Sequence, residues 1–151
     1  MTTYQTKQGN VTVRPMEFKD INAIFDIDRS LIGEERAGTL LNLVPEDLTG
    51  TLNLSLIAEI ENRLVGFILA RHTYIGEPII EAGLIQGLGI HPLYQKQGIG
   101  AQLVDALTKH CQSNSISTIR VILSEKDSRL ESFFSHMGFS RAKLIVCDKK
   151  L

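Results

Sequence analysis

The sequence has few of the features that mark secreted, membrane or nucleic-acid-binding proteins. Its 151 residues include two cysteines, Cys111 and Cys147, which are too few for a disulfide framework and lack the spacing of metal ligands. No apolar run approaches the roughly 20 residues of a membrane-spanning helix, and the start MTTYQTKQGN is too polar for a signal peptide. A formal net charge of −1 gives no electrostatic reason to bind nucleic acid or an anionic membrane. We therefore expect a cytoplasmic protein with reduced thiols and with no nucleic-acid or membrane partner.

The composition is that of an ordinary globular domain. Hydrophobic residues make up 43% of the chain and charged residues 22%, which are common values for folded proteins. No repeat, low-complexity tract or linker divides the chain. This length is enough to bury one core, so the sequence predicts a single domain over residues 1–151.

Apolar periodicity predicts a mixed order of strands and helices. Alternating or continuous apolar runs predict strands at residues 11–14, 54–60, 64–74, 79–90, 118–123 and 139–151. Helical spacing predicts helices at residues 18–31, 34–43, 98–114 and 127–137. The strand, helix and strand between residues 79 and 123 predict a parallel crossover, and we expect the strand at 118–123 to be buried on both faces. The predicted fold class is α/β, with a mixed sheet of about six or seven strands and helices on both faces.

The stretch QKQGIG, residues 95–100, joins a predicted strand to the clearest predicted helix. A helix start presents unpaired N–H groups and the positive end of the helix dipole, and glycines let a bulky anion approach them. The stretch lacks the Gly-Lys-Ser/Thr ending of a Walker A loop, and Leu103 stands where a dinucleotide fingerprint has its third glycine. On this spacing alone, a glycine-rich helix start without a ligand remains the alternative.

Two segments together resemble a known family. Residues 90–103, IHPLYQKQGIGAQL, resemble the acyl-CoA-binding motif Arg/Gln-x-x-Gly-x-Gly/Ala of the GNAT superfamily of N-acetyltransferases. Gln95, Gly98 and Gly100 stand at its three defining positions. Residues 127–139, DSRLESFFSHMGF, are similar to the segment N-x-x-A-x-x-F-Y-x-x-x-G-F of that family. The resemblance implies a GNAT-like fold, acetyl-CoA as the acyl donor, no metal, and acetyl transfer to a primary amine by direct attack in a ternary complex.

The resemblance also implies which residues contact the cofactor. Amides of the loop would hold the pyrophosphate, Gln95 would brace the loop, and the strand before it would pair with the pantetheine arm. The amide of Ile90 would polarise the thioester carbonyl. The implied cofactor-binding residues are Leu88, Gly89, Ile90, Gln95, Lys96, Gln97, Gly98, Ile99, Gly100, Ala101, Asp127, Phe133 and Phe134. A strand with small residues that only serve its packing is the alternative for the glycines before residue 90.

Two positions depart from the family pattern. Gln86 and Phe134 stand where many members carry a glutamate and a tyrosine, and neither side chain can titrate. Glutamine can position a water molecule, so proton removal from the amine would run through water. Tyr74 shares a strand face with His72 and is the other candidate acid or base. The catalytic candidates are therefore Ile90, Gln86 and Tyr74.

Acidic residues after the first strand predict the acceptor side. Asp28, Glu34 and Glu35 would form a negative lip that attracts an amine, and a solvated charged face is the alternative. The acceptor is expected to be a small amine, an amino acid or a protein N-terminus, and a homodimer is possible. The departures at Gln86 and Phe134 leave a catalytically weak acyl-CoA-binding or regulatory module as the alternative function.

Overall fold

Six strands form one mixed sheet in the computed structural model of the chain, which describes residues 2–6, 8–32, 44–45, 48–50 and 52–151. The bounds of the strands are β1 Thr2–Thr6, β2 Gly9–Pro15, β3 Leu56–Ile60, β4 Arg63–Ile75, β5 Ile80–Ile90 and β6 Ile119–Val121. They lie in the order β1-β2-β3-β4-β5-β6. Neighbours from β1 to β5 are antiparallel, and β6 runs parallel to β5, so the predicted crossover is confirmed.

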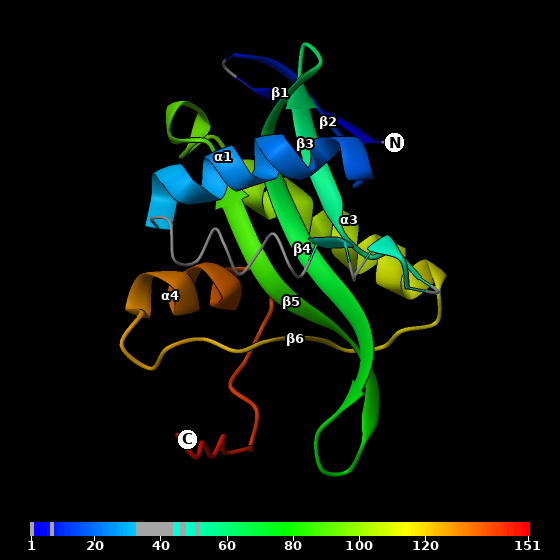
Figure 1. Cartoon of the computed structure of the whole chain (residues 1–151), viewed down its shortest axis with the longest axis vertical. Coiled ribbons are helices and arrows are strands. Elements are labelled where there is room, and N and C mark those ends of the chain that lie inside the picture. The colour runs from blue at the N-terminus through cyan, green and yellow to red at the C-terminus, as the bar shows by residue number, and fades with distance from the viewer. Residues whose placement is uncertain (1, 7, 33–43, 46–47, 51) are drawn as a thin grey trace.

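Helices cover both faces of this sheet (Figure 1). Their bounds are η1 Phe18–Asp20 and α1 Ile21–Ile32, then η2 Pro92–Tyr94, α3 Ile99–Ser113 and α4 Ser128–His136. Side chains alternate along β4, so that Phe67 packs against the α1 side while Ile68 packs with Leu103 of α3 on the other side. Phe134 of α4 belongs to the same core cluster as α3. The predicted α/β class with helices on both faces is confirmed.

Three expectations about the elements need correction, and a fourth lies outside the described residues. The sequence missed β1, because its polar residues TTYQT form an edge strand with little hydrophobic signal. The strand predicted at 118–123 is shorter in the structure, where β6 spans Ile119–Val121. Its residues are half-buried rather than buried on both faces, because β6 is the other edge strand of the sheet. Residues 140–151 form no closing strand and are exposed. The helix predicted at 34–43 falls among the residues that the structure does not describe.

A bulge at Gln86 changes the direction of the side chains along β5. Ala70 of β4 pairs with Ile85, but the preceding Leu69 pairs with Gly87, so Gln86 is the extra residue. Before the bulge, a Cβ on Gly83 would lie 3.1 Å from the sulfur of Cys111 on α3. After it, a Cβ on Gly89 would lie 2.6 Å from the ring of Phe67 on the α1 side. Odd-numbered residues of β5 therefore face α3 before the bulge and α1 after it.

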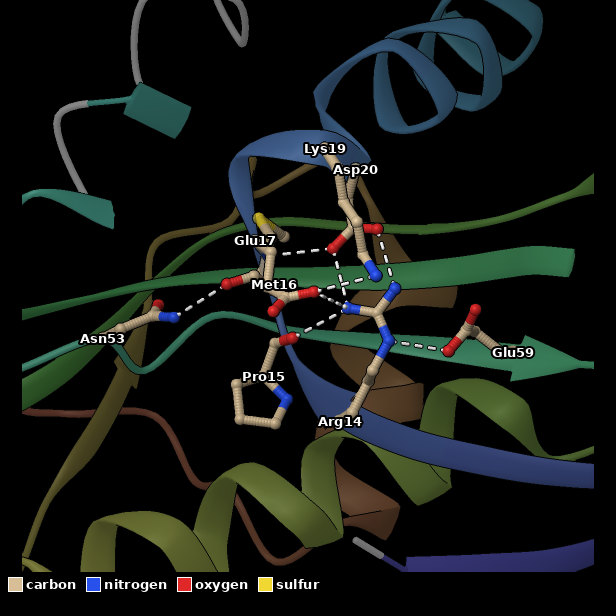
Figure 2. Close-up of polar contacts among 8 residues, drawn as sticks. All are labelled: Arg14, Pro15, Met16, Glu17, Lys19, Asp20, Asn53 and Glu59. Atoms are coloured by element: carbon tan, nitrogen blue, oxygen red, sulfur yellow. Dashed lines mark hydrogen bonds and ion pairs between the residues drawn. The ribbon is translucent and has the colours of Figure 1, made fainter. Parts of the chain in front are cut away.

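Arg14 joins β2 to β3 and to η1 (Figure 2). Its guanidinium donates to both carboxylate oxygens of Asp20 at 2.8 Å and to Glu59 Oε1 at 2.6 Å. The Glu17 N–H also donates to Asp20 Oδ2, at 2.8 Å. Burial by itself raises the pKa of Asp20, but the hydrogen bonds from Arg14 and from the Glu17 N–H outweigh it and lower that pKa below its ordinary value.

We expect Asp20→Asn to lower the free energy of unfolding by about 2 kcal/mol at pH 7, because it weakens hydrogen bonds to a charged group. A carboxyl whose folded pKa is lowered stabilises the protein above its unfolded pKa, near 4, and this stabilisation is lost as the pH falls through the folded pKa. The difference between wild type and variant should therefore shrink in urea unfolding experiments from pH 5 towards pH 2. Asp26→Asn is the control, because Asp26 forms an exposed ion pair with Arg29 that is worth at most about 0.5 kcal/mol. A constant difference across this pH range would contradict the expectation.

Candidate active site

β5 and β6 separate part-way along their length. They pair only through residues 83–85 of β5, although β5 continues to Ile90. Ala70 of β4 lies opposite Ile85. The Ala70 N–H donates to Ser55 Oγ, and the Ala70 carbonyl accepts a hydrogen bond from the Ser55 hydroxyl, so both main-chain groups of Ala70 point towards β3. Ile85 therefore turns its own main-chain groups towards β6. Beyond residue 85 this edge of β5 has no paired strand, and we call the space beside residues 86–90 of β5 the gap.

The main-chain groups of Leu88 and Ile90 face the same gap. The His91 N–H donates to Val65 O on β4 at 2.8 Å, so the preceding residue, Ile90, turns its main-chain groups the other way. Leu88 lies two positions before Ile90 and shares its direction. In the described part of the chain no strand pairs with this edge beyond residue 85. The gap therefore offers N–H donors at Leu88 and Ile90.

The loop after β5 leads directly to the start of α3. Gln95 Nε2 donates to Ile90 O at 3.1 Å, which ties the loop to the end of β5. Lys96 and Gly98 have φ values of +61° and +81°, and a Cβ on Gly98 would meet nothing within 4 Å. Gly98 is the N-cap of α3 and supplies no side-chain cap.

The first turn of α3 presents uncapped donors. The Gln102 N–H donates to Gly98 O at 3.0 Å as the first bond of the helix. The N–H groups of Ile99, Gly100 and Ala101 therefore have no acceptor inside the helix. An anion in the open space beside Gly98 would accept these hydrogen bonds and meet the positive end of the helix dipole.

A contact that the sequence did not predict supports the loop from the β1–β2 turn. Gln8 Nε2 donates to Leu93 O at 3.3 Å, and Gln97 Nε2 donates to Gln8 Oε1 at 3.0 Å. Gln97 Oε1 is buried and has no hydrogen-bond partner among the described residues. Gln8 carries no local signal of this role, because the contact joins residues 89 positions apart.

α4 packs against the start of α3, and its three predicted residues have different surroundings. Asp127 Oδ1 accepts the Leu130 N–H at 3.0 Å and so caps α4. The ring of Phe133 would lie 3.5 Å from a Cβ on Gly100. Phe134 is only 3% exposed and forms ring contacts with Phe133 and Phe139, with centroids 5.1 Å apart in each pair. Phe133 is therefore the ring that reaches the loop, and Phe134 is part of the core.

The structure places Gln86 at the gap but Tyr74 far from it. Gln86 lies where β5 leaves β6, and its Oε1 atom is buried with no hydrogen-bond partner among the described residues. Tyr74 is 64% exposed and pairs with Glu81 at the other end of β5. The distance along the strand from Glu81 to Ile90 is about 30 Å. The structure therefore does not bring Tyr74 together with Ile90 and Gln86.

Only one residue of the expected acidic lip lies in the part of the chain that the structure describes, and it is buried. Asp28 is 0% exposed and lies on the inner side of α1, so its carboxylate is not part of an exposed surface. Glu34 and Glu35 lie outside the described residues. α1 is nevertheless next to the gap, because Leu31 Cδ1 would lie 3.3 Å from a Cβ on Gly89. The described part of α1 therefore lines this side of the gap.

Other reactive groups lie away from the gap or are not grouped. Cys111 is 1% exposed, and burial raises the pKa of its thiol to about 11, whereas Cys147 is exposed. Within the described ranges, no three His, Cys, Asp or Glu side chains are grouped as metal ligands would be. None of the helices described there has the length and apolar character needed to cross a bilayer.

The acetyltransferase (GNAT) domain family matches residues 52–141, a stretch that begins before β3 and ends after α4. The chain belongs to the GNAT acetyltransferase family. Its enzyme class is acyltransferase, with acetyl-CoA as the acyl donor. The expectations about family, fold and cosubstrate are confirmed.

Solved structures share this GNAT fold at low sequence identity. AAC(6')-Iy in complex with the bisubstrate analogue CoA-S-monomethyl-acetylneamine has a TM-score of 0.76 and 16% identity, covering 93% of this chain and 98% of that chain. A ribosomal-protein-alanine N-acetyltransferase from Brucella melitensis biovar Abortus 2308 has a TM-score of 0.71 and 15% identity, covering 93% and 99%. A possible acetyltransferase from Clostridium difficile 630 has a TM-score of 0.77 and 13% identity, covering 93% and 97%. At these identities the likeness shows the fold alone, and comparison with curated proteins gives no match.

Proposed function

We propose that this GNAT protein transfers acetyl from acetyl-CoA to a primary amine by direct attack in a ternary complex at the gap between β5 and β6. One observation carries the proposal. The free edge of β5 leads to the uncapped start of α3, so N–H donors follow one another along a single continuous path. An acyl-CoA presents acceptors in the same order, from its thioester carbonyl through its amide arm to its pyrophosphate. When bound, acetyl-CoA supplies the activated acetyl group.

Each segment of the path has a separate task in this proposal. The Leu88 N–H, which lies farther from α3 and nearer to Gln86, donates to the thioester carbonyl oxygen, and the main chain of Ile90 pairs with the pantetheine arm. This order exchanges the roles that the family resemblance implied for Ile90 and Leu88. The N–H groups at the start of α3 hold the pyrophosphate in the open space beside Gly98. The hydrogen bond from Gln95 to Ile90 O holds the loop before α3 against the end of β5.

Gln86 is the positioning residue for the attacking amine. Its buried Oε1 atom can accept a hydrogen bond from the amine or from a water molecule that removes the proton of the ammonium group. Glutamine cannot take that proton itself, so the proton leaves through water. We place the acceptor on the α1 side of the gap, where Leu31 reaches Gly89. A small amine, an amino acid and a protein N-terminus are the candidate acceptors.

Release of free thiol from acetyl-CoA, measured across a panel of small amines, amino acids and peptides with free N-termini, tests this function. We expect release with at least one acceptor and a matching mass increase of one acetyl group on that acceptor. Tight CoA binding in calorimetry without transfer to any acceptor would favour the alternative function, a catalytically weak acyl-CoA-binding module. That alternative is motivated by Gln86 and Phe134, which stand in place of a titratable glutamate and tyrosine. No CoA binding would overturn both functions.

Gln86→Glu is expected to raise kcat/KM at neutral pH by about 10-fold, because it adds a titratable base beside the gap. The variant should also gain a pH dependence that reports the pKa of the new carboxyl group. Gln86→Leu is the matched control, since it keeps the size of the side chain and removes its acceptor, and it should be slower than wild type. Equal rates in all three proteins would show that residue 86 does not touch the attacking amine or its water.

A further inference from the structure

The amide side chain of Gln8, in the turn between β1 and β2, bridges the two ends of the loop before α3. Gln8 Nε2 donates to Leu93 O at 3.3 Å, and Gln8 Oε1 accepts from Gln97 Nε2 at 3.0 Å. Leu93 lies in η2, and Gln97 directly precedes Gly98, the N-cap of α3. One side chain from outside the loop therefore holds the span from residue 93 to residue 97 in place.

The backbone of this loop needs support from outside, because Lys96 has a φ of +61°. A residue other than glycine seldom adopts this left-handed conformation, which persists where neighbouring contacts hold it. Gln95, before Lys96, donates to Ile90 O at 3.1 Å. Gln97, after Lys96, donates to Gln8. The strained residue is therefore held between two side-chain hydrogen bonds, one of which ends on the β1–β2 turn.

The β1–β2 turn is a firm support for Gln8. Thr6 Oγ1 donates to Gly9 O at 2.6 Å and accepts the Gln8 N–H at 3.3 Å, so the Thr6 hydroxyl closes the turn. A Cβ on Gly9 would lie 3.3 Å from Ile60 Cγ2, so the turn packs directly against the end of β3. The hairpin therefore presents Gln8 to the loop from a fixed position.

We propose that Gln8 is a positioning residue for the acyl donor, and that it makes the enzyme favour acyl-CoA over thioesters that lack the pyrophosphate. This inference rests on the proposed pyrophosphate site at the start of α3. Without the bridge, residues 93–97 are free to move, and binding then has to order them again. That cost falls on ligands that use the uncapped N–H groups of α3, because the loop leads directly into Gly98. A ligand held only by the edge of β5 does not need the loop in this position.

Binding measurements with Gln8→Ala test this role without any acceptor. We expect the variant to bind CoA and dephospho-CoA, which both carry the pyrophosphate, about 5-fold more weakly in calorimetry, because it loses two hydrogen bonds to the loop. Pantetheine has the same thiol arm without the pyrophosphate or the nucleotide, and its affinity, followed by NMR titration, should not change. Equal losses for CoA and pantetheine would indicate a merely structural role and overturn the proposal, as would an unchanged affinity for CoA.

Gln5→Ala is the matched control for this variant. Gln5 lies on the same hairpin, but its side chain donates to the adjacent Thr6 O at 3.4 Å, within β1. It should bind CoA as wild type does. With an acceptor amine, Gln8→Ala should raise the KM for acetyl-CoA about 5-fold and leave kcat close to wild type, because Gln8 holds the donor loop and not the reacting atoms. A fall in kcat at an unchanged KM would contradict positioning of the donor.

Gly98→Asp separates a failure of this inference from a failure of the proposed function. If Gly98→Asp weakens CoA binding and Gln8→Ala does not, the pyrophosphate lies at the start of α3 but Gln8 does not position the loop for it. If neither change affects CoA binding, the pyrophosphate lies elsewhere and both proposals are wrong.

Discussion

Gly98→Asp is expected to weaken CoA binding about 100-fold while the protein stays folded. A Cβ at residue 98 points into space that contains no atom within 4 Å, so the side chain would enter the region assigned to the pyrophosphate. A carboxylate about 5 Å from a phosphate charge costs about 3 kcal/mol at an effective dielectric constant of 20, which corresponds to about 100-fold in affinity. The same carboxylate is favourable at the helix N-terminus of the free protein. Calorimetric titration with CoA measures the loss.

Gly98→Asn is the matched control for this change. Asparagine has the same shape as aspartate and tolerates the positive φ of +81° equally well, but it carries no charge. We expect it to weaken CoA binding by no more than about 3-fold, because it crowds the site without adding the charge repulsion that causes most of the loss in Gly98→Asp. Two variants that bind CoA as tightly as wild type would show that the anion does not lie at the start of α3. Equal losses in both variants would show that the open space matters but that no charge lies there.

Phe134→Ala is expected to lower the free energy of unfolding by about 3–5 kcal/mol, the usual cost of removing a buried aromatic ring. The ring is 3% exposed and is held by edge-on contacts with Phe133 and Phe139. Phe18→Ala is the control, because Phe18 is 57% exposed and should change stability by less than about 0.5 kcal/mol. Urea unfolding at pH 7 measures both values.

The conservative variant Phe134→Leu separates a role in the core from a role at the cofactor. We expect it to lower stability by about 1–2 kcal/mol and to change CoA affinity less than 3-fold, because the ring belongs to the core cluster behind α3. The family resemblance instead implies that this ring packs against the cofactor. A loss of CoA affinity above 10-fold at nearly unchanged stability would favour that role.

Local patterns in the sequence were sufficient to predict most elements of the fold. The stripe of Ile99, Leu103 and Leu107 predicts α3 because a helix repeats every 3.6 residues, and the apolar runs of β3, β4 and β5 are equally plain. β1 is polar and pairs at an edge, so it leaves no such pattern. The strand expected after Phe139 failed for a different reason. Its residues are suitable for a strand, but they do not pair with the outer edge of β6 or with any other described strand, and an unpaired segment is not stable as a strand.

The site was predictable where it depends on local main-chain chemistry. Gly98 and Gly100, together with the family motif that they match, predict an anion site at the start of α3, and the structure has uncapped N–H donors there. Tertiary contacts decided the rest. No sequence pattern shows that Gln8 supports the loop, that Asp28 is buried, or that Tyr74 lies at the far end of β5. The bulge at Gln86 also reverses the faces that simple alternation assigns.

Amide-resolved NMR during a titration with CoA tests the proposed binding path most directly. The largest shifts are expected at the N–H groups of Leu88 and Ile90 on β5 and of Ile99, Gly100 and Ala101 at the start of α3. Little change is expected around Cys111, which lies near the other end of α3. This pattern would place the cofactor along the free edge of β5 and the uncapped helix. Shifts centred on Cys111 and Phe139, with an unchanged start of α3, would contradict it.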